Sequence, residues 1–309
     1  GYLALQATTT ADKNVAVGGN CLQANTTGTD NNAVGYAALY ANTTGNDNTA
    51  MGDNALGANT TASNNTAVGS SALLANTTGA FNTALGALAL DAATTSNSNV
   101  GVGYAALGAA TTGANNTAVG TNSLDANTTG GFNVAVGQGS LGSNTTADNN
   151  TAIGYNALTA NTTGTELVAV GAQALAANTT ADNNTAVGHR ALDGAVTMSN
   201  NTAIGAQCMT GSVTGGQNTA VGTESLEANT GGDDNVAVGY RALEANTTGA
   251  RNVAVGRVAL GSQATESNCT AVGYYALVNS TTSSDHTAVG NYALATNTTG
   301  ESNTAIGLY

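Results

Sequence analysis

A glycine recurs every 17 residues along the whole chain, from Gly1 through Gly18 to Gly307, without an insertion or a deletion. The 309 residues therefore hold 18 repeats and the first three residues of another. With this glycine as slot 1, the consensus is G-Y-x-A-L-x-A-N-T-T-G-x-x-N-T-A-V. A short fixed period is typical of proteins whose repeats stack on one another. We therefore expect residues 1–309 to form a single repeat array.

The repeat is too short for two helices and a turn, and its N-T-A-V segment alternates polar and apolar residues as a strand does. One short strand per repeat predicts an all-β fold, a parallel β-solenoid (β-roll) of 18 coils stacked about 4.8 Å apart. Residues 17 positions apart would then be in contact. The slot-1 glycine is expected to adopt positive φ or to lie against another backbone. The coil-turn glycines singled out for this role are Gly18, Gly35, Gly52, Gly154 and Gly307.

Slots 1, 5, 16 and 17 hardly vary, which predicts that they form the buried framework of the coil. Slot 14 is Asn in all but three repeats, and stacked asparagines can hydrogen-bond along a cross-β axis. We expect such a ladder there, and a hydroxyl ladder at the slot-10 threonines. The exceptions Leu167, Cys269 and His286 predict local weak points, although an imidazole can join the ladder. The ladder residues singled out are Asn14, Asn31, Asn48, Asn65, Asn150, Asn184 and Asn303.

All 18 acidic and all 5 basic residues occupy slots 2, 3, 6, 11, 12 and 13, together with every Tyr and Phe. These slots are expected to be the exposed corners of the coil. The net charge of −13 argues against nucleic-acid binding, and no apolar run is long enough to span a membrane. Charges one coil apart predict the ion pairs Glu224–Arg241 and Asp234–Arg251, each a weak surface pair.

Aromatic residues also fall into columns at these corners. Tyr240, Arg257 and Tyr274 share slot 2 and are spaced for cation–π stacking. A second column occupies slot 3 and consists of Tyr275, Tyr292 and Tyr309. We interpret the second column as ladder packing, with a sugar-stacking or partner-docking strip as the alternative.

Other residue patterns favour structural over chemical roles. Glu227 and Glu244 stack like charges, which we interpret as solvated carboxylates rather than a Ca²⁺ site. Cys21 and Cys208 replace the slot-4 alanine and are expected to be buried, whereas Cys269 could pair only with a partner chain. The slot-8 asparagines lie in N-T-T sequons, for which we favour a turn or ladder over glycosylation. Two histidines without a triad partner in register predict no catalytic residue, no metal and no cofactor.

Two features predict association between copies. Both faces of the T-A-V and A-L segments carry small or apolar residues, as with Ala4 beside Leu5 and Ala16 beside Val17. One face would line the coil and the other would meet further copies around a common axis. The repeat pattern starts and stops without capping repeats, which predicts head-to-tail contacts that build an open filament.

The segment N-T-A-I-G-Y-N-A-L at residues 150–158 resembles the repeated coil in the heads of YadA-type trimeric autotransporter adhesins. It is also similar to the N-T-A-V-G-Y…N-T-T-G arrays of bacterial and phage tail-fibre-like proteins. The resemblance covers every repeat, although the period here is longer than the usual adhesin-head coil. It implies a trimeric, left-handed parallel β-roll displayed outside a cell or on a virion.

The sequence thus predicts a non-enzymatic extracellular fibre or adhesin shaft, a structural rod whose variable corners attach to a surface or host. Its expected partners are copies of itself and cell-surface or host glycans. The alternative is an ice- or surface-binding solenoid that uses threonine columns. The spacing argues against that alternative, because adjacent threonines at slots 9 and 10 of one strand would point to opposite faces.

Overall fold

A computed structural model describes residues 1–194, 196–281 and 284–309. It shows an all-β parallel β-solenoid, so the predicted fold class is confirmed. Each repeat contributes one three-residue strand, in slots 15 to 17. The strands are β1 (Val15–Val17), β2 (Asn32–Val34), β3 (Thr49–Met51), β4 (Thr66–Val68), β5 (Thr83–Leu85), β6 (Val100–Val102), β7 (Thr117–Val119), β8 (Val134–Val136), β9 (Thr151–Ile153), β10 (Val168–Val170), β11 (Thr185–Val187), β12 (Thr202–Ile204), β13 (Thr219–Val221), β14 (Val236–Val238), β15 (Val253–Val255), β16 (Thr270–Val272), β17 (Thr287–Val289) and β18 (Thr304–Ile306).

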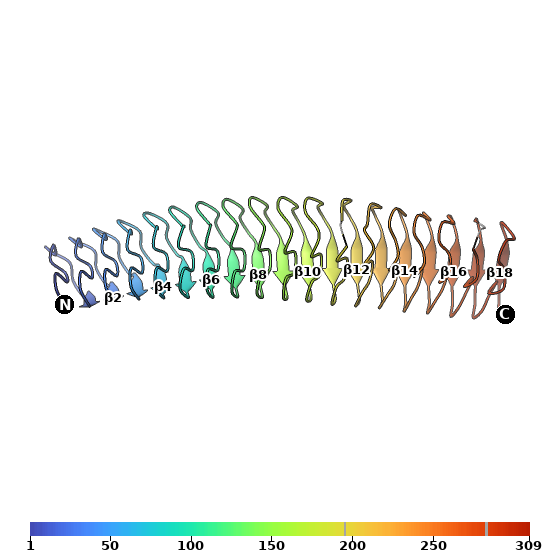
Figure 1. The fold of residues 1–309 in the computed structure, drawn as a ribbon, viewed down its shortest axis with the longest axis horizontal. Helices are drawn as coiled ribbons and strands as arrows, with labels where there is room; N and C mark the ends of the chain where they lie inside the picture. Colours follow the sequence, from blue (N-terminus) through green and yellow to red (C-terminus); the bar gives the residue numbers. More distant parts are fainter. Residues whose placement is uncertain (195, 282–283) are drawn as a thin grey trace. The chain divides into compact units, whose positions relative to one another are not determined.

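The coils form two compact units, Gly1–Asn150 with β1 to β8 and Thr151–Tyr309 with β9 to β18. Within each unit, every strand pairs in parallel with the next strand along the chain, side by side along one flank of the coils (Figure 1). The pairing is in register, as where Ala50 of β3 faces Ala67 of β4. Each slot therefore stacks on the same slot of the next coil, as the period predicts.

The core is narrow and consists mainly of alanine and leucine. In the fourth repeat, Ala55, Leu56 and Ala67 are fully buried, and the same slots 4, 5 and 16 recur in the core of the other coils. Slots 4 and 5 both point inward, so the prediction that A-L has two opposite faces is wrong. The reason is that slots 3 and 5 adopt left-handed backbone, with φ of 54° at Ala37 and 52° at Leu39, so that the alternation of an extended strand does not apply.

Slot 17 points outward, so the prediction that it belongs to the buried framework is also wrong. Its side chains are half-exposed or exposed, for example 45% at Met51 and 49% at Leu85. The strand is extended, and its middle residue in slot 16 faces the core, so slots 15 and 17 must both face away from it. Slot 11 was predicted to be an exposed corner, but most of its residues are buried, including Glu266 at 5% exposure.

The slot-1 glycines meet both expectations. Gly18 has φ of +133°, and a Cβ on it would lie 2.3 Å from the carbonyl oxygen of Gly35 in the next coil. Gly35 and Gly52 repeat this arrangement in the first unit, and Gly154 repeats it in the second. Gly307 shares the positive φ, at +147°. Neither the conformation nor the space admits a larger residue.

The slot-14 asparagines form the predicted ladder, although most of its bonds join side chain to backbone. Asn48 donates from Nδ2 to the carbonyl of Ala62 at 2.9 Å, and its backbone N–H donates to Asn31 Oδ1 at 3.0 Å. The direct amide contact from Asn48 Nδ2 to Asn31 Oδ1 is 3.1 Å. Equivalent bonds involve the other predicted members, Asn14, Asn65, Asn150, Asn184 and Asn303.

The three exceptions at slot 14 stay within the coil. His286 joins the ladder, because its Nδ1 accepts the backbone N–H of Asn303 at 3.1 Å. The backbone N–H of Cys269 still donates to Asn252 Oδ1 at 2.9 Å, and Leu167 is fully buried. All three cysteines are buried, as predicted for Cys21 and Cys208. The expectation that Cys269 could pair only with a partner chain stays a prediction.

The slot-8 asparagines form a second ladder, and here amide bonds to amide directly. Asn42 donates from Nδ2 to Asn25 Oδ1 at 2.9 Å, and Asn59 donates to Asn42 Oδ1 at 2.9 Å. The same Nδ2 atoms donate to a slot-11 carbonyl of their own coil, Gly45 or Ala62, at 3.0 Å. The sequon nitrogens of Asn42 and Asn59 are therefore buried and already bonded, which fits the ladder better than glycosylation at these positions.

The hydroxyl ladder lies at slot 9, not at slot 10. Thr26 donates from Oγ1 to the carbonyl of Thr43 at 3.0 Å, and Thr43 donates to Thr60 in the same way. The neighbouring slot-10 residues, such as Thr27 and Thr44, are exposed. The prediction therefore placed the ladder one residue too far along the repeat. None of the described residues forms a helix long and apolar enough to cross a bilayer.

Candidate functional surfaces

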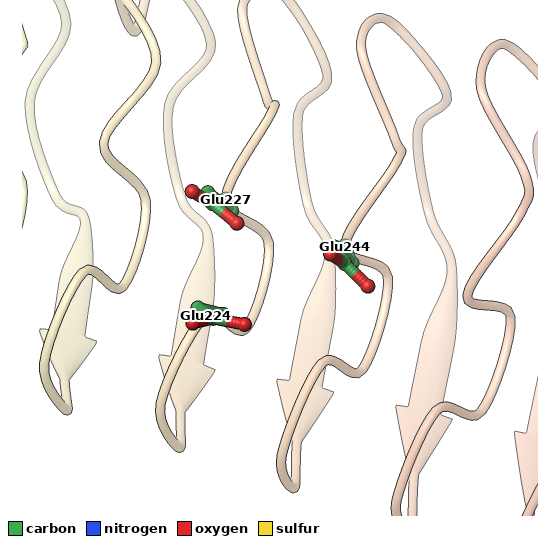
Figure 2. A group of neighbouring side chains, drawn as sticks. All are labelled: Glu224, Glu227 and Glu244. Atoms are coloured by element: carbon green, nitrogen blue, oxygen red, sulfur yellow. The ribbon is translucent and has the colours of Figure 1, made fainter.

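Three carboxylates and one guanidinium gather at the corners that follow β13 and β14. Figure 2 shows Glu224 and Glu227 on one coil and Glu244 on the next. One oxygen from each carboxylate lies within 4.8 Å of the others. Arg241 Nε contacts Glu224 Oε2 at 2.5 Å, as predicted, and Glu244 Oε1 at 3.5 Å.

The electrostatics of this cluster are those of a partly neutralised corner. Burial raises the pKa of Glu227, the carboxylates of Glu224 and Glu244 raise it further, and Arg241 opposes them. Arg241 already pairs with two of the three carboxylates, those of Glu224 and Glu244. This arrangement supports the interpretation of the cluster as a surface charge network rather than as a Ca²⁺ site.

The second predicted ion pair, Asp234–Arg251, is wrong. Arg251 instead donates from Nε to Asn268 Oδ1 at 2.7 Å, and Asn268 donates in turn to Asp285 Oδ1 at 3.0 Å. The side chain therefore points toward the following coil, where an amide relays it to a carboxylate. Two pairs that were not predicted are Lys13–Asp30 at 3.9 Å and Arg190–Asp193 at 2.5 Å.

The predicted cation–π column is present. The guanidinium of Arg257 lies 5.5 Å from the ring centroid of Tyr240 and 5.8 Å from that of Tyr274. Arg241 also lies over the Tyr240 ring, at 5.2 Å. The arginines and tyrosines thus alternate along the corner and hold neighbouring coils together.

The slot-3 aromatic column forms a continuous stack. The Tyr275 and Tyr292 centroids are 5.4 Å apart, and the nearly parallel Tyr292 and Tyr309 rings are 5.6 Å apart. Each ring of this stack thus turns a face to its neighbour, which supports the ladder interpretation over a sugar-stacking strip.

A shallow groove on the first unit was not predicted. It has a volume of about 510 Å³ and is lined by residues of slots 2, 3, 6 and 7 in four successive coils. Tyr36 and Tyr40 are prominent in its wall and are 60% and 44% exposed. The signal in the sequence is a comparison down slot 6, where Gly57 separates Tyr40 from Leu74.

A second surface consists of the outward side chains of slots 15 and 17, which we call the outer sheet face. It carries Thr, Val or Ile at nearly every strand, with Asn32, Met51 and Leu85 as exceptions, and no charged residue. In β7, for example, Thr117 and Val119 point outward on either side of buried Ala118. In-register pairing turns these side chains into two continuous columns in each unit.

The two histidines and the Cys208 thiol lie in different settings. His189 is exposed at a corner, whereas His286 is buried in the slot-14 ladder. Burial raises the pKa of the Cys208 thiol to about 11, and the hydrogen bond to Ser225 only partly offsets this. A thiol of that pKa is a weak nucleophile at neutral pH.

No family model, curated protein or solved structure matches the chain.

Proposed function

We propose that the protein is a non-enzymatic structural rod, an extracellular fibre or adhesin shaft, whose copies associate through the outer sheet face. The observation that carries this proposal is the outer sheet face itself. Ten strands about 4.8 Å apart give the second unit an uncharged strip about 43 Å long. Contiguous apolar patches of several hundred Å² usually mark interaction surfaces in soluble proteins.

A second copy of the chain is the occupant that fits this face best. Its columns would repeat with the same strand spacing, so side chains from two faces can interleave at every coil. Another protein would need the same repeat distance to match so many positions. The trimer implied by the sequence resemblance would place three such faces around one axis, and the variable corners would remain outside for attachment.

The oligomeric mass tests this proposal. The 29.9 kDa chain should form a defined multimer in analytical ultracentrifugation. A double variant, Val119→Lys and Val136→Lys, places two charges on the outer sheet face and should shift the protein to monomer. The control, Thr112→Lys and Thr129→Lys, places the same charges on exposed slot-10 positions of the same coils and should leave the multimer intact. A wild-type monomer would contradict the proposal.

One observation favours a second candidate, a surface that binds ice or another ordered solid. Thr and Val alternate with buried alanine in strands such as β7, so both outward residues point the same way in two regular columns. The expectation from the sequence placed this role on the threonines of slots 9 and 10. The slot-9 hydroxyl, however, already donates a hydrogen bond to a backbone carbonyl of the next coil. Thermal hysteresis from a monomeric protein, abolished by Val119→Lys, would favour this candidate over the fibre.

A further inference from the structure

The groove on the first unit exists because one side chain is missing from a corner column. Slot 6 carries Tyr40, Gly57 and Leu74 in three successive coils. Tyr40 and Leu74 are therefore two coil spacings apart, about 10 Å, with only a hydrogen between them. A Cβ on Gly57 would already lie 3.3 Å from Leu74 Cδ1. Gly57 and Ala58 thus form the floor of a hollow that any longer slot-6 side chain would fill.

The aromatic rings of the groove offer surface that the C-terminal tyrosines do not. Tyr36 and Tyr40 are both exposed, and neither stacks on another ring among the described residues. Gly19 lies beside Tyr36, where a Cβ would be 3.5 Å from the ring, so no side chain covers that part of it. A ring that is fixed at its base and open to solvent can pack against the C–H face of a pyranose.

The groove also contains uncharged polar groups that can hydrogen-bond to the hydroxyls of a ligand. Asn20 donates from Nδ2 to Tyr36 Oη at 3.3 Å, which orients the ring. Asn20 Oδ1 is one of several buried side-chain oxygens without a hydrogen-bond partner among the described residues, and its burial keeps it out of reach of a ligand. Asn54 adds a second amide to the lining, and none of the lining residues is charged. The groove therefore combines exposed aromatic rings with uncharged amide and hydroxyl groups.

We propose that this groove binds a neutral saccharide, with Tyr36 and Tyr40 packing against sugar rings and with the Asn54 amide and the Tyr36 hydroxyl hydrogen-bonding to sugar hydroxyls. A saccharide offers both an apolar face and hydroxyl donors, which an aliphatic ligand does not. The absence of charge in the lining favours a neutral sugar over an acidic one. The proposal builds on the attachment role proposed above and assigns to it a ligand class and a place on the chain.

Saturation-transfer difference NMR tests the proposal on the full chain with three neutral probes, cellotriose, maltotriose and triacetylchitotriose. At least one probe should receive saturation from the wild-type protein. Gly57→Gln should reduce the affinity at least tenfold by filling the hollow, and the fold should tolerate it because Gln6 and Gln23 occupy the same slot. Tyr36→Ala should have a similar effect.

Matched controls separate the groove from general changes to the coil. Gly108→Gln alters the same slot outside the groove, and Tyr104→Ala removes a slot-2 tyrosine that is 54% exposed. Both should bind the probe within twofold of wild type. Absence of saturation transfer to all three probes, or undiminished binding by Gly57→Gln, would overturn the proposal. The multimer mass distinguishes the two proposals, because Gly57→Gln should keep it and a failure of the groove leaves the outer sheet face untouched.

Discussion

Left-handed backbone at residues other than glycine sets the shape of each coil. Slots 3, 5 and 13 adopt φ near +55°, for example at Asn54, Leu56 and Asn64. This conformation costs a residue with a side chain about 1–2 kcal/mol. The cost is offset because the same residues bond across coils, as where the N–H of Leu56 donates to the carbonyl of Ala72 at 3.0 Å. Neighbouring coils thus hold a conformation that one coil alone would not keep.

The buried thiol of Cys208 predicts a specific pH dependence. Its pKa is about 11 in the folded protein against 9.0 for the ordinary thiol, chiefly because burial disfavours the thiolate. The folded-state pKa is the higher one, so the resulting stability is present in full below pH 9 and is lost as the pH rises through 11. Urea unfolding from pH 8 to pH 11 should show this decline.

Cys208→Ala provides the control, since alanine is the usual slot-4 residue. The stability of this variant should fall less steeply over the same pH range. Thiol-reactive dye should also label native Cys208 slowly at pH 8 and rapidly after denaturation. Equal slopes for the two proteins would show that the Cys208 thiol titrates alike in both states.

At the scale of the element, the sequence predicts the period, the strand and the coil-turn glycine, because each leaves a strict pattern. It does not predict which slots point outward. Alternation holds only in extended chain, and the left-handed leucine of slot 5 places Ala38 and Leu39 both inside the coil. Slot 17 was misassigned because an invariant apolar residue marks an outer sheet face as well as a core.

The candidate surfaces were predicted unevenly for a related reason. Stacks of one slot, such as Tyr292 on Tyr309, follow directly from the period. The partner of Arg251 does not follow from the period, because a long side chain can turn toward either neighbouring coil. The groove depends on slots 2, 3, 6 and 7 together, and only knowledge of how the coil folds brings these slots side by side.

The slot-8 ladder makes a prediction for a single coil. Asn59→Ala removes the donor to both Asn42 Oδ1 and the carbonyl of Ala62. Asn42 Oδ1 then loses its partner in the coil interior, whereas the carbonyl keeps its bond from Asn48. We expect a loss of about 1–3 kcal/mol in the free energy of unfolding. Thr61→Ala, at an exposed slot-10 position of the same coil, should cost less than about 0.5 kcal/mol. Urea titration checks both, and equal costs would argue against the ladder as a stabilising element.

At the scale of the whole chain, in-register stacking makes one coil interchangeable with another. Deleting residues 103–119 removes one complete repeat and joins Val102 to Gly120 with every slot still in register. The shortened protein should fold with nearly unchanged thermal stability in circular dichroism. Deleting residues 103–118 instead shifts all following slots by one and should destabilise the first unit strongly. Similar melting curves for the two deletions would show that slot register does not govern the fold.

The hydrogen bonds between coils also decide how the protein responds to force. Within each unit they link successive coils, so tension along the stack loads them one coil after another rather than all at once. A coil that detaches releases 17 residues, or about 50–60 Å of extended chain. A shaft made in this way yields in small equal steps under a sudden pull, and each step dissipates energy while the remaining coils stay folded.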